Sequence, residues 1–179
     1  MNKILLVITG SIAASRCKEI ISLLNNKEVN ISCILTKEAK KYVKISDIKK
    51  LLKNRIFTDE DEKKNKMLHI NLSRDNDIIV VCPATANSIA KFANGYGDNL
   101  ASNTLLAANK KILFVPAMNS FMWHNKINQK NVRLLKDSGH EFIGPTVGNL
   151  KCGEFGLGRI DNSKNIVTVS YTHLRAHET

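Results

Sequence analysis

The sequence predicts a three-layer α/β fold in which helices cover both faces of a mostly parallel sheet. Apolar runs rich in Ile and Val alternate along the chain with segments whose apolar residues recur at helical spacing. Two of the apolar runs end at a proline, and small or hydroxyl residues follow, as at the start of a helix. With 179 residues, 43% of them hydrophobic and 24% charged, the composition is that of one globular domain.

The first strand, the first helix and the second strand are expected to follow one another directly. Residues 3–9 form a continuous apolar run, as expected of a strand buried on both faces of a parallel sheet. Gly10 and Ser11 turn the chain into a helix over residues 12–24, where apolar side chains recur at helical spacing. The apolar run at 29–35 predicts the second strand.

The next part of the chain is more charged. The Lys-rich segment 45–56 is expected to hold a short helix, and the charged residues 59–66 are expected to form a mobile loop. Residues 69–74 predict a short helix or a turn. The third strand is expected at 77–82, a run of Ile and Val that ends at Pro83.

Three helices and two strands are expected after this point. Residues 85–93 and 100–108 predict helices, and the apolar run 111–115 predicts the fourth strand, which a second proline ends. A further helix over 125–138 ends at a glycine, as helices commonly do. A short fifth strand is expected at 141–143.

The last part of the chain holds a glycine-rich segment and an unusual tail. Residues 144–158 contain five glycines and a proline, which predicts a loop rather than a helix or a strand. Residues 170–179 are crowded with His and Arg in a chain otherwise poor in both, so they are interpreted as a candidate non-native tail. One domain is therefore expected over residues 1–169, and whether the tail is native stays open.

The net charge of +11 comes from 27 Lys and Arg against 16 Asp and Glu. This excess suits an anionic partner, but only six of the cations are Arg, and they do not interleave with aromatic residues as in nucleic-acid-binding proteins. A solvated Lys-rich surface is the better interpretation, so no nucleic-acid partner is expected. No apolar run approaches the ~20 residues of a membrane span, and the N-terminal run is too short for a signal peptide. We therefore expect a cytoplasmic protein without a membrane partner.

The four cysteines are of two kinds. Cys17, Cys33 and Cys82 lie in apolar segments and are expected in the core. No C-x-x-C pair and no histidine at metal-ligand spacing accompanies the cysteines, so neither a metal site nor a disulfide framework is expected. Cys152 differs from the others because it lies in the glycine-rich segment.

Residues at the ends of the first two strands suit a phosphate, because ligands of parallel α/β sheets bind beyond the carboxyl ends of the strands. Gly10 and Ser11 allow a tight turn and a helix N-terminus that attracts an anion. The other glycines of a dinucleotide fingerprint are missing, and the second strand ends at Thr36 rather than at an acidic residue, so a mononucleotide fits better than NAD. Taken alone, the Gly-Ser turn is more often a plain tight turn.

Two further strand ends add polar groups. Residues 84–88 place small and hydroxyl side chains at a helix start, which again suits a phosphate. Asn119 offers both donors and acceptors and can hold a carboxylate or a flavin edge. On spacing alone, Met118, Met122 and Trp123 are explained by core packing.

Together these segments resemble one family, the flavin-dependent cysteine decarboxylases. Residues 116–123, P-A-M-N-S-F-M-W, match the family's P-x-M-N-x-x-M-W motif without a departure. Residues 69–72 resemble its catalytic-histidine segment, and residues 83–88 and 97–100 resemble its flavin-binding and D-N-L segments. Residues 150–160 resemble its substrate-clamp loop, A-C-G-x-x-G-x-G-R-M.

The resemblance covers residues 3–168 and implies a Rossmann- or flavodoxin-like sheet. It implies FMN-dependent decarboxylation of 4′-phosphopantothenoylcysteine to 4′-phosphopantetheine, a step of coenzyme A biosynthesis. In that reaction the cysteine end of the substrate is oxidised to a thioaldehyde, loses carbon dioxide and is reduced again. By the resemblance, His69 would be the base of the oxidation and Asn119 would hold the substrate carboxylate; an imidazole has an unperturbed pKa near neutrality. Cys152 would supply the proton of the re-reduction, since a thiol with a pKa of about 8.5 stays protonated.

The resemblance also implies the binding residues. FMN would contact Gly10, Ser11, Ile12, Thr36, Thr85, Ala86, Asn87, Ser88 and Ala117. The substrate would contact Asn119, Met122, Lys151, Gly153 and Arg159. The glycines of segment 144–158 suit a lid that closes over the substrate. In this family the flavin lies between subunits of a trimer, so a homotrimer or a higher assembly of trimers is expected. His69 and Asn119 of one chain then need not serve the same site.

Cys152 favours the coenzyme A branch, because that branch returns a saturated product whereas lantibiotic decarboxylases stop at the enethiol. Lys151 and Ile160 stand where the clamp loop usually has Ala and Met, which affects its contacts more than its chemistry. Two alternatives stay open, a peptidyl-cysteine decarboxylase of lantibiotic type and a non-catalytic flavin-binding regulatory subunit. Those subunits have acidic extensions that this basic chain lacks, and a flavin prenyltransferase would lack the P-x-M-N-x-x-M-W motif. Whether the chain is a stand-alone enzyme or a piece of a fusion with a synthetase also stays open.

Overall fold

A computed structural model describes residues 1–52 and 55–178 and confirms the predicted three-layer α/β fold. Its six-stranded sheet has the order β3-β2-β1-β4-β5-β6, and each neighbouring pair is parallel. The strands are β1 (Lys3–Ile8), β2 (Asn30–Leu35), β3 (Ile56–Phe57), β4 (Ile78–Ala84), β5 (Ile112–Pro116) and β6 (Glu141–Phe142). The chain winds outward from β1 in one direction and from β4 in the other, so the order reverses between these two central strands.

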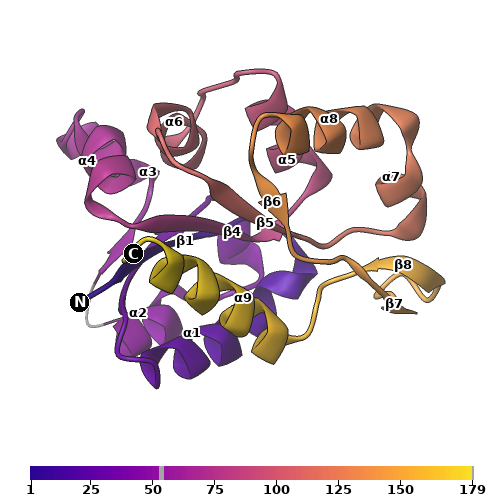
Figure 1. Cartoon of the computed structure of the whole chain (residues 1–179), viewed down its shortest axis with the longest axis horizontal. Helices are drawn as coiled ribbons and strands as arrows, with labels where there is room; N and C mark the ends of the chain where they lie inside the picture. The colour runs from indigo at the N-terminus through magenta and orange to yellow at the C-terminus, as the bar shows by residue number, and fades with distance from the viewer. Residues whose placement is uncertain (53–54, 179) are drawn as a thin grey trace.

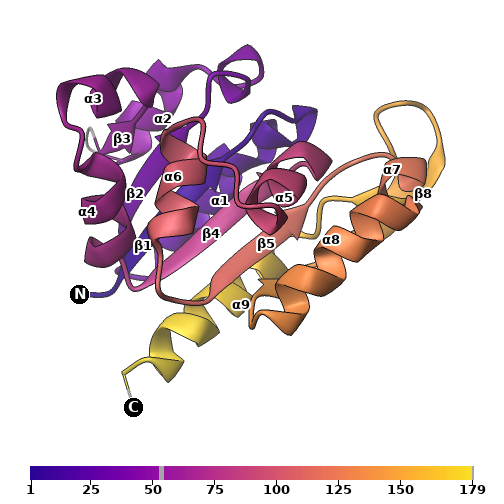
Figure 2. The ribbon, with the colours of Figure 1, turned by 90° about the horizontal axis from the view of Figure 1, so that it is seen from above.

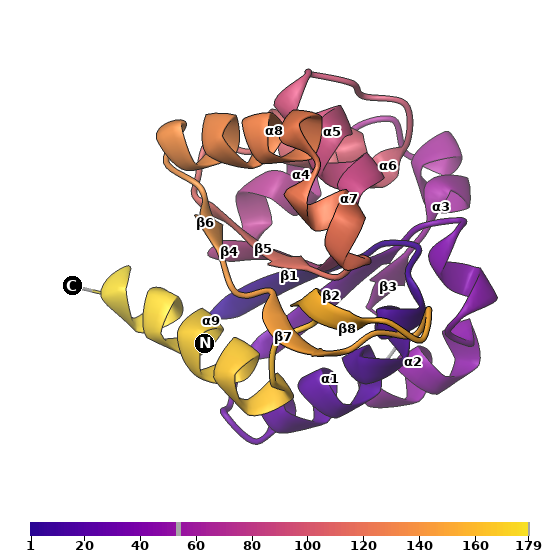
Figure 3. The ribbon, with the colours of Figure 1, turned by 90° about the vertical axis from the view of Figure 1, so that its right-hand side faces the viewer.

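Helices cover both faces of the sheet, as Figure 1 shows from the side and Figure 3 from one end. One face is covered by α1 (Cys17–Asn25), α2 (Ile45–Leu52) and α9 (Ser163–Ala176). The other is covered by α4 (Leu68–Asp75), α5 (Ala86–Ala93), α6 (Leu100–Ala107) and α8 (Lys126–Asp137). The short elements are η1 (Ile12–Arg16), η2 (Ala39–Lys41), α3 (Asp59–Lys64) and α7 (Ser120–His124). Among the described residues no helix is long and apolar enough to cross a bilayer.

The core consists of two layers, one on each face of the sheet. Side chains of β1 alternate between them: Leu6 packs in the layer beneath α1, and Leu5 packs in the opposite layer with Phe114. The prediction that Cys17, Cys33 and Cys82 belong to the core is confirmed, because all three are fully buried. The Cys17 thiol donates a hydrogen bond to the Cys82 carbonyl at 3.3 Å. The neighbouring Cys82 side chain and burial raise the pKa of the Cys17 thiol.

The prediction of a mobile loop over residues 59–66 is wrong, because α3 occupies most of it. The Thr58 amide donates to the Asp61 carboxylate at 2.8 Å, half of a capping box that begins the helix. Asp59 also accepts a hydrogen bond at 2.9 Å from the amide of Leu100, the first residue of α6. Acidic side chains at a helix N-terminus are stabilising, so the charges that predicted disorder instead fix two helix starts.

The prediction of a loop over residues 144–158 is also wrong. The segment forms a hairpin of β7 (Thr146–Asn149) and β8 (Phe155–Arg159), joined by a turn that includes Cys152. Its glycines permit close approach of the backbone rather than irregular structure. A Cβ atom at Gly156 would lie 2.9 Å from the Ser120 hydroxyl oxygen, so the hairpin packs tightly against α7, which the sequence did not predict.

The boundary expected at residue 169 falls inside α9, which continues to Ala176. Within the expected tail, Ser170 and Leu174 are 2% and 1% exposed. Leu174 packs in the core layer beneath α1, so the expected tail contacts the rest of the chain. The two strands that were expected to end before a proline extend to include it. Pro83 lies within β4, and Pro116 is the last residue of β5.

Candidate functional site

A cavity of about 360 Å³ lies beyond the carboxyl ends of β1 and β4, where the strand order of the sheet reverses. That position is the general binding place of parallel α/β sheets. Its wall combines hydroxyl, amide and apolar side chains from the loops after β1, β2, β4 and β5 and from α5 and α6. Among these lining residues are Gly10, Ser11, Thr36, Thr85, Ala86, Asn87, Ser88, Phe92, Ser102 and Ala117. We call it the inner cavity.

The polar groups of the inner cavity are held by local caps. The Ser11 hydroxyl accepts a hydrogen bond from the Ala13 amide at 3.2 Å, and the Thr85 hydroxyl accepts one from the Ser88 amide at 3.1 Å. The first amides of α5, those of Ala86 and Asn87, have no partner within the helix and lie at its positive end. These amides and hydroxyls fit a phosphate, and the apolar wall fits a planar ring, so the donor set fits a flavin mononucleotide.

One cation lines the inner cavity, and it is already paired. The Lys91 ammonium lies 2.9 Å from the Asp98 carboxylate. The hydrogen bond from Lys91 lowers the pKa of Asp98, with the Ser102 hydroxyl and the residue's own amide adding to the effect. The Asp98 side chain is 55% exposed, so the contribution of the pair to stability is small. A phosphate in the inner cavity would therefore be held by amides and hydroxyls rather than by a free cation.

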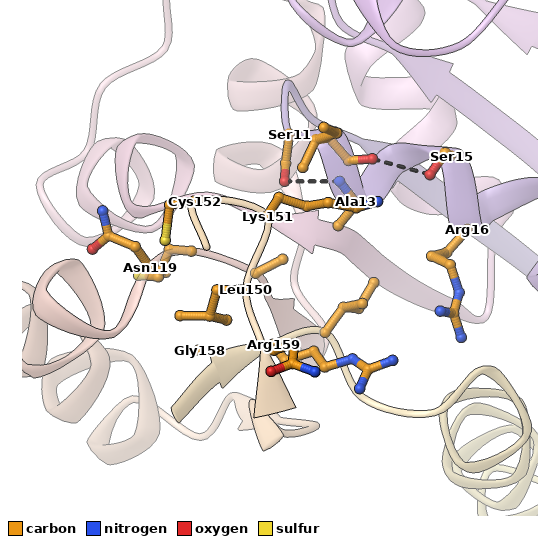
Figure 4. A pocket seen from close by; sticks show the side chains of 15 residues that line it. Ser11, Ala13, Ser15, Arg16, Asn119, Leu150, Lys151, Cys152, Gly158 and Arg159 are labelled. Atoms are coloured by element: carbon orange, nitrogen blue, oxygen red, sulfur yellow. Dashed lines mark hydrogen bonds between the residues drawn. The ribbon is translucent and has the colours of Figure 1, made fainter. Parts of the chain in front are cut away.

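A larger cavity of about 490 Å³ adjoins the inner one and is shown in Figure 4. We call it the outer cavity. Its wall comes from η1, the loop after β5 and the hairpin of β7 and β8. Ser11, Ala117 and Met118 line both cavities, so the two are separated by a thin shared wall. A planar group in the inner cavity and a chain-like molecule in the outer cavity would meet at these residues.

Asn119 lines the outer cavity and begins α7. Its side-chain oxygen accepts a hydrogen bond from the Met122 amide at 2.8 Å, the usual role of an N-cap asparagine. The helix is anchored by Trp123, which is 8% exposed and whose carbonyl accepts a bond from Asn128 at 3.2 Å. With its oxygen occupied, the Asn119 side chain has its two N–H donors left for a ligand, and donors are what a carboxylate requires.

Cys152 lies on the exposed turn of the hairpin and lines the outer cavity. The turn is closed by the Leu150 amide, which donates to the Glu154 carbonyl at 2.8 Å, and by the Gly153 amide, which donates to the Leu150 carbonyl at 3.0 Å. Gly153 has a φ of +88°, a left-handed conformation that favours glycine. The turn thus holds the thiol at the cavity wall, on the same side of the cavity as Asn119 in Figure 4.

The hairpin is joined to the loop after β5 through Gly158, whose carbonyl accepts a hydrogen bond from the Met118 amide at 3.0 Å. A Cβ atom at Gly158 would lie 2.2 Å from the Met118 carbonyl oxygen, and the residue has a φ of +153°. We expect Gly158→Ala to lower the free energy of unfolding by about 1–3 kcal/mol, since backbone strain and overpacking act together. Denaturant titration of both proteins measures this loss.

The matched control for this prediction is Gly139→Ala. Gly139 also has a positive φ, +94°, but a Cβ atom there would meet open space. The Gly139→Ala variant therefore measures the loss of stability that the positive φ alone causes, without a steric clash of the added Cβ atom. Equal losses for the two variants would show that the close approach at Gly158 does not matter.

The structure brings most of the predicted site residues together. Eight of the nine predicted FMN contacts line the inner cavity, and the ninth, Ile12, lines the outer one. Of the predicted catalytic and substrate residues, the outer cavity is lined by Asn119, Cys152, Lys151 and Arg159, and Met122 lines the inner cavity. Gly153 lines neither.

His69 also lines neither cavity of its own chain. It lies on α4, at the opposite end of the molecule from the hairpin, as Figure 2 shows. Its Nδ1 atom lies 2.8 Å from a carboxylate oxygen of Glu62, and the side chain is 26% exposed. Within one chain, therefore, this histidine does not meet the outer cavity.

Sequence reasoning missed Arg16, Glu38 and Ser102, which line the cavities. Arg16 follows the Gly-Ser turn by about one helical turn and is one of six arginines in a Lys-rich chain, a signal that was available. Nothing in the sequence around Glu38 or Ser102 indicates that these residues line a cavity. A Cβ atom on Gly10 would meet the Cβ of Glu38 at 2.3 Å, so this approach is a tertiary contact that the sequence does not reveal.

Comparison with known proteins gives consistent matches over nearly the whole chain. The family described as Flavoprotein matches residues 1–175. The coenzyme A biosynthesis bifunctional protein CoaBC of Bacillus subtilis is 35% identical over 180 residues, which are 99% of this chain but only 44% of that protein. A probable phosphopantothenoylcysteine decarboxylase of Streptococcus mutans is 31% identical over 170 residues, 93% of this chain and 95% of that protein.

Solved structures give the same picture. A PPC decarboxylase variant complexed with pantothenoylaminoethenethiol superposes with a TM-score of 0.86 at 28% identity, over 96% of this chain and 97% of that one. The FMN-dependent cysteine decarboxylase SpaF superposes with a TM-score of 0.80 at 26% identity, over 96% and 98% of the two chains. The chain therefore shares its overall fold with these proteins.

Proposed function

This chain belongs to the Flavoprotein family and, within it, to the flavin-dependent cysteine decarboxylases; we propose that it decarboxylates 4′-phosphopantothenoylcysteine to 4′-phosphopantetheine in coenzyme A biosynthesis. One observation supports this above the others. A flavin-sized inner cavity shares the wall of Ser11, Ala117 and Met118 with an outer cavity lined by a thiol and a carboxamide. A decarboxylation that proceeds through oxidation of the substrate by a flavin requires the cofactor and the substrate to lie next to each other.

The cofactor of this proposal is FMN, held in the inner cavity. The hydroxyls and helix-start amides around Ser11 and Thr85 would hold its phosphate, and the apolar side chains around Met118 would flank its ring. The chemistry that FMN supplies when bound is a reversible two-electron oxidation of the substrate's cysteine end, so the overall reaction has no net oxidation. The protein residues bind, orient and move protons.

Asn119 orients the substrate carboxylate in this proposal. Its side-chain oxygen is occupied by the Met122 amide, so its N–H groups donate to the carboxylate. This contact aligns the bond that breaks when carbon dioxide leaves. Lys151 and Arg159 add positive charge to the same cavity, which favours an anionic substrate.

Cys152 supplies the last proton in this proposal. After loss of carbon dioxide the product must gain a proton at carbon, and the thiol lines the same cavity as Asn119. The exposed turn allows the hairpin to act as a lid that excludes water during this step.

His69 acts as the base in the site of another copy of the chain, because it does not meet its own outer cavity. Its Nδ1 atom lies 2.8 Å from a carboxylate oxygen of Glu62, and the other ring nitrogen is left for the substrate. The proposal therefore includes a homotrimer, acting in the cytoplasm, whose sites combine residues of two subunits.

The test is the mass of the product formed from 4′-phosphopantothenoylcysteine by the purified protein loaded with FMN. Conversion to 4′-phosphopantetheine supports the proposed function. If the protein is yellow with bound flavin yet yields no product, the assigned substrate is wrong, and cysteine-ended peptides are the next substrates to try.

A further inference from the structure

The outer cavity has a cationic end that the reacting groups do not use. Arg16 and Arg159 both line it, and both also line an adjoining hollow of about 200 Å³. Figure 4 shows Asn119 and Cys152 at one side of the outer cavity and the two guanidinium groups toward the other. The cavity thus has a reacting end and an end with two positive charges.

These charges are only weakly compensated. Within the described part of the chain, Arg159 has no carboxylate at ion-pair distance, and Arg16 has one, Glu19, with 3.6 Å between the nearest atoms. The Nε atom of Arg16 is buried and makes no hydrogen bond. The Glu19 carboxylate is itself engaged by the Ser163 hydroxyl at 2.7 Å. A buried donor without a partner is costly, so the site favours an incoming acceptor.

A further carboxylate, that of Asp161, lines the small hollow and accepts hydrogen bonds from neutral donors. One oxygen accepts a hydrogen bond from the Asn162 amide and the other from the Asn165 side chain, both at 2.6 Å. Among the described residues Asp161 forms no ion pair with Arg16 or Arg159, so both guanidinium groups remain available to an external anion.

We propose that Arg16 and Arg159 bind the terminal phosphate of the substrate, at the end remote from its cysteine. This inference rests on the proposed function and deepens it, because it assigns the residues that distinguish a phosphorylated substrate from its unphosphorylated form. A phosphate monoester carries a charge of about −1.5 to −2 at neutral pH. Guanidinium groups bind such oxygens in bidentate fashion, and two of them match the charge of one dianion.

The length of the substrate is consistent with this assignment. A pantothenoyl arm separates the phosphate from the cysteine, so the two ends must bind at different places in one cavity. The outer cavity falls within the roughly 300–1,000 Å³ of small-molecule sites, and the adjoining hollow extends it beyond the two arginines.

The test compares binding of 4′-phosphopantetheine and pantetheine to the full-length protein loaded with FMN, by calorimetry. The wild type is expected to prefer the phosphorylated compound. Arg16→Gln and Arg159→Gln should each reduce that preference by about 10- to 100-fold, as for loss of a charge-assisted hydrogen bond. The matched control is Lys18→Gln, which removes an exposed cation from α1 that pairs with Asp47 and lines none of the three cavities.

The outcomes separate this inference from the proposed function. If the wild type binds both compounds with equal affinity, the phosphate subsite is wrong while the proposed function stands. If it binds neither and forms no product, the proposed function itself fails. If Lys18→Gln lost as much of the preference for the phosphorylated compound as Arg16→Gln does, the preference would depend on net charge alone. That result would overturn the proposed phosphate subsite. Retention of the full preference by both arginine variants would overturn it as well.

Discussion

Cys152→Ser is expected to convert the protein from a producer of 4′-phosphopantetheine into a producer of a compound two hydrogens lighter. The thiol lines the outer cavity on an exposed turn, and the proposed reaction needs a proton donor there only after carbon dioxide has left. A positioned proton donor contributes about 10²–10⁴-fold to its step, so the saturated product should fall by at least about 100-fold. Mass spectrometry of the products measures both compounds, and carbon dioxide release should persist.

The control is Glu154→Gln, a change on the same turn. Its backbone carbonyl, which closes the turn by accepting from the Leu150 amide, is unaffected, and its side chain lines neither cavity. This variant should form the saturated product at close to the wild-type rate. If Cys152→Ser formed 4′-phosphopantetheine as well as the wild type does, the thiol would not be the proton donor. The assignment to the coenzyme A branch would then lose its main support.

Asn119→Asp is expected to lower kcat/KM by at least about 100-fold while leaving the fold intact. The aspartate retains an oxygen for the Met122 amide, and Asp caps helices as well as Asn does. It loses the two N–H donors and places a negative charge against the substrate carboxylate. Loss of the charge-assisted hydrogen bond alone should lower kcat/KM by about 10- to 100-fold, and repulsion between the two carboxylates should lower it further. Steady-state kinetics together with thermal unfolding separates the two roles.

Asn119→Ser is the intermediate case for this site. Serine also caps the helix, and it removes the amide donors without adding charge. The expected order of activity is therefore wild type, then Ser, then Asp, with similar unfolding temperatures for all three. An Asp variant as active as the wild type would show that Asn119 serves only as the cap of α7.

The central sheet could be predicted from the sequence because its signals are local. Each apolar run near β1, β2, β4 and β5 is long enough for a strand and short enough to exclude a helix, and it became a strand within a residue or two of its expected limits. The start of α5 was equally clear, since Thr85 is a cap that acts on its own neighbours. The family was recognisable for the same reason, because its residues form contiguous motifs such as 116–123.

The errors fall where distant residues decide the structure. The acidic segment 59–66 predicted disorder, but Asp59 binds the amide of Leu100, and that contact helps to hold α3 in place. The glycines of 144–158 predicted a loop, but Gly158 joins the hairpin to the backbone of Met118. Neither partner is visible in the local pattern, because composition reports what a segment does in solvent rather than what it packs against.

The sequence by itself determined the fold class, the buried strands and the residue types of the site. Only the tertiary structure decided how those residues are divided. It placed most of the predicted FMN contacts in one cavity and Cys152 in the adjoining one. It left His69 at the other end of the molecule and placed Arg16 and Arg159 on the wall of one cavity. The physical reason is that helix and strand periodicity fixes which side chains share a face, whereas the meeting of two loops depends on how the layers pack.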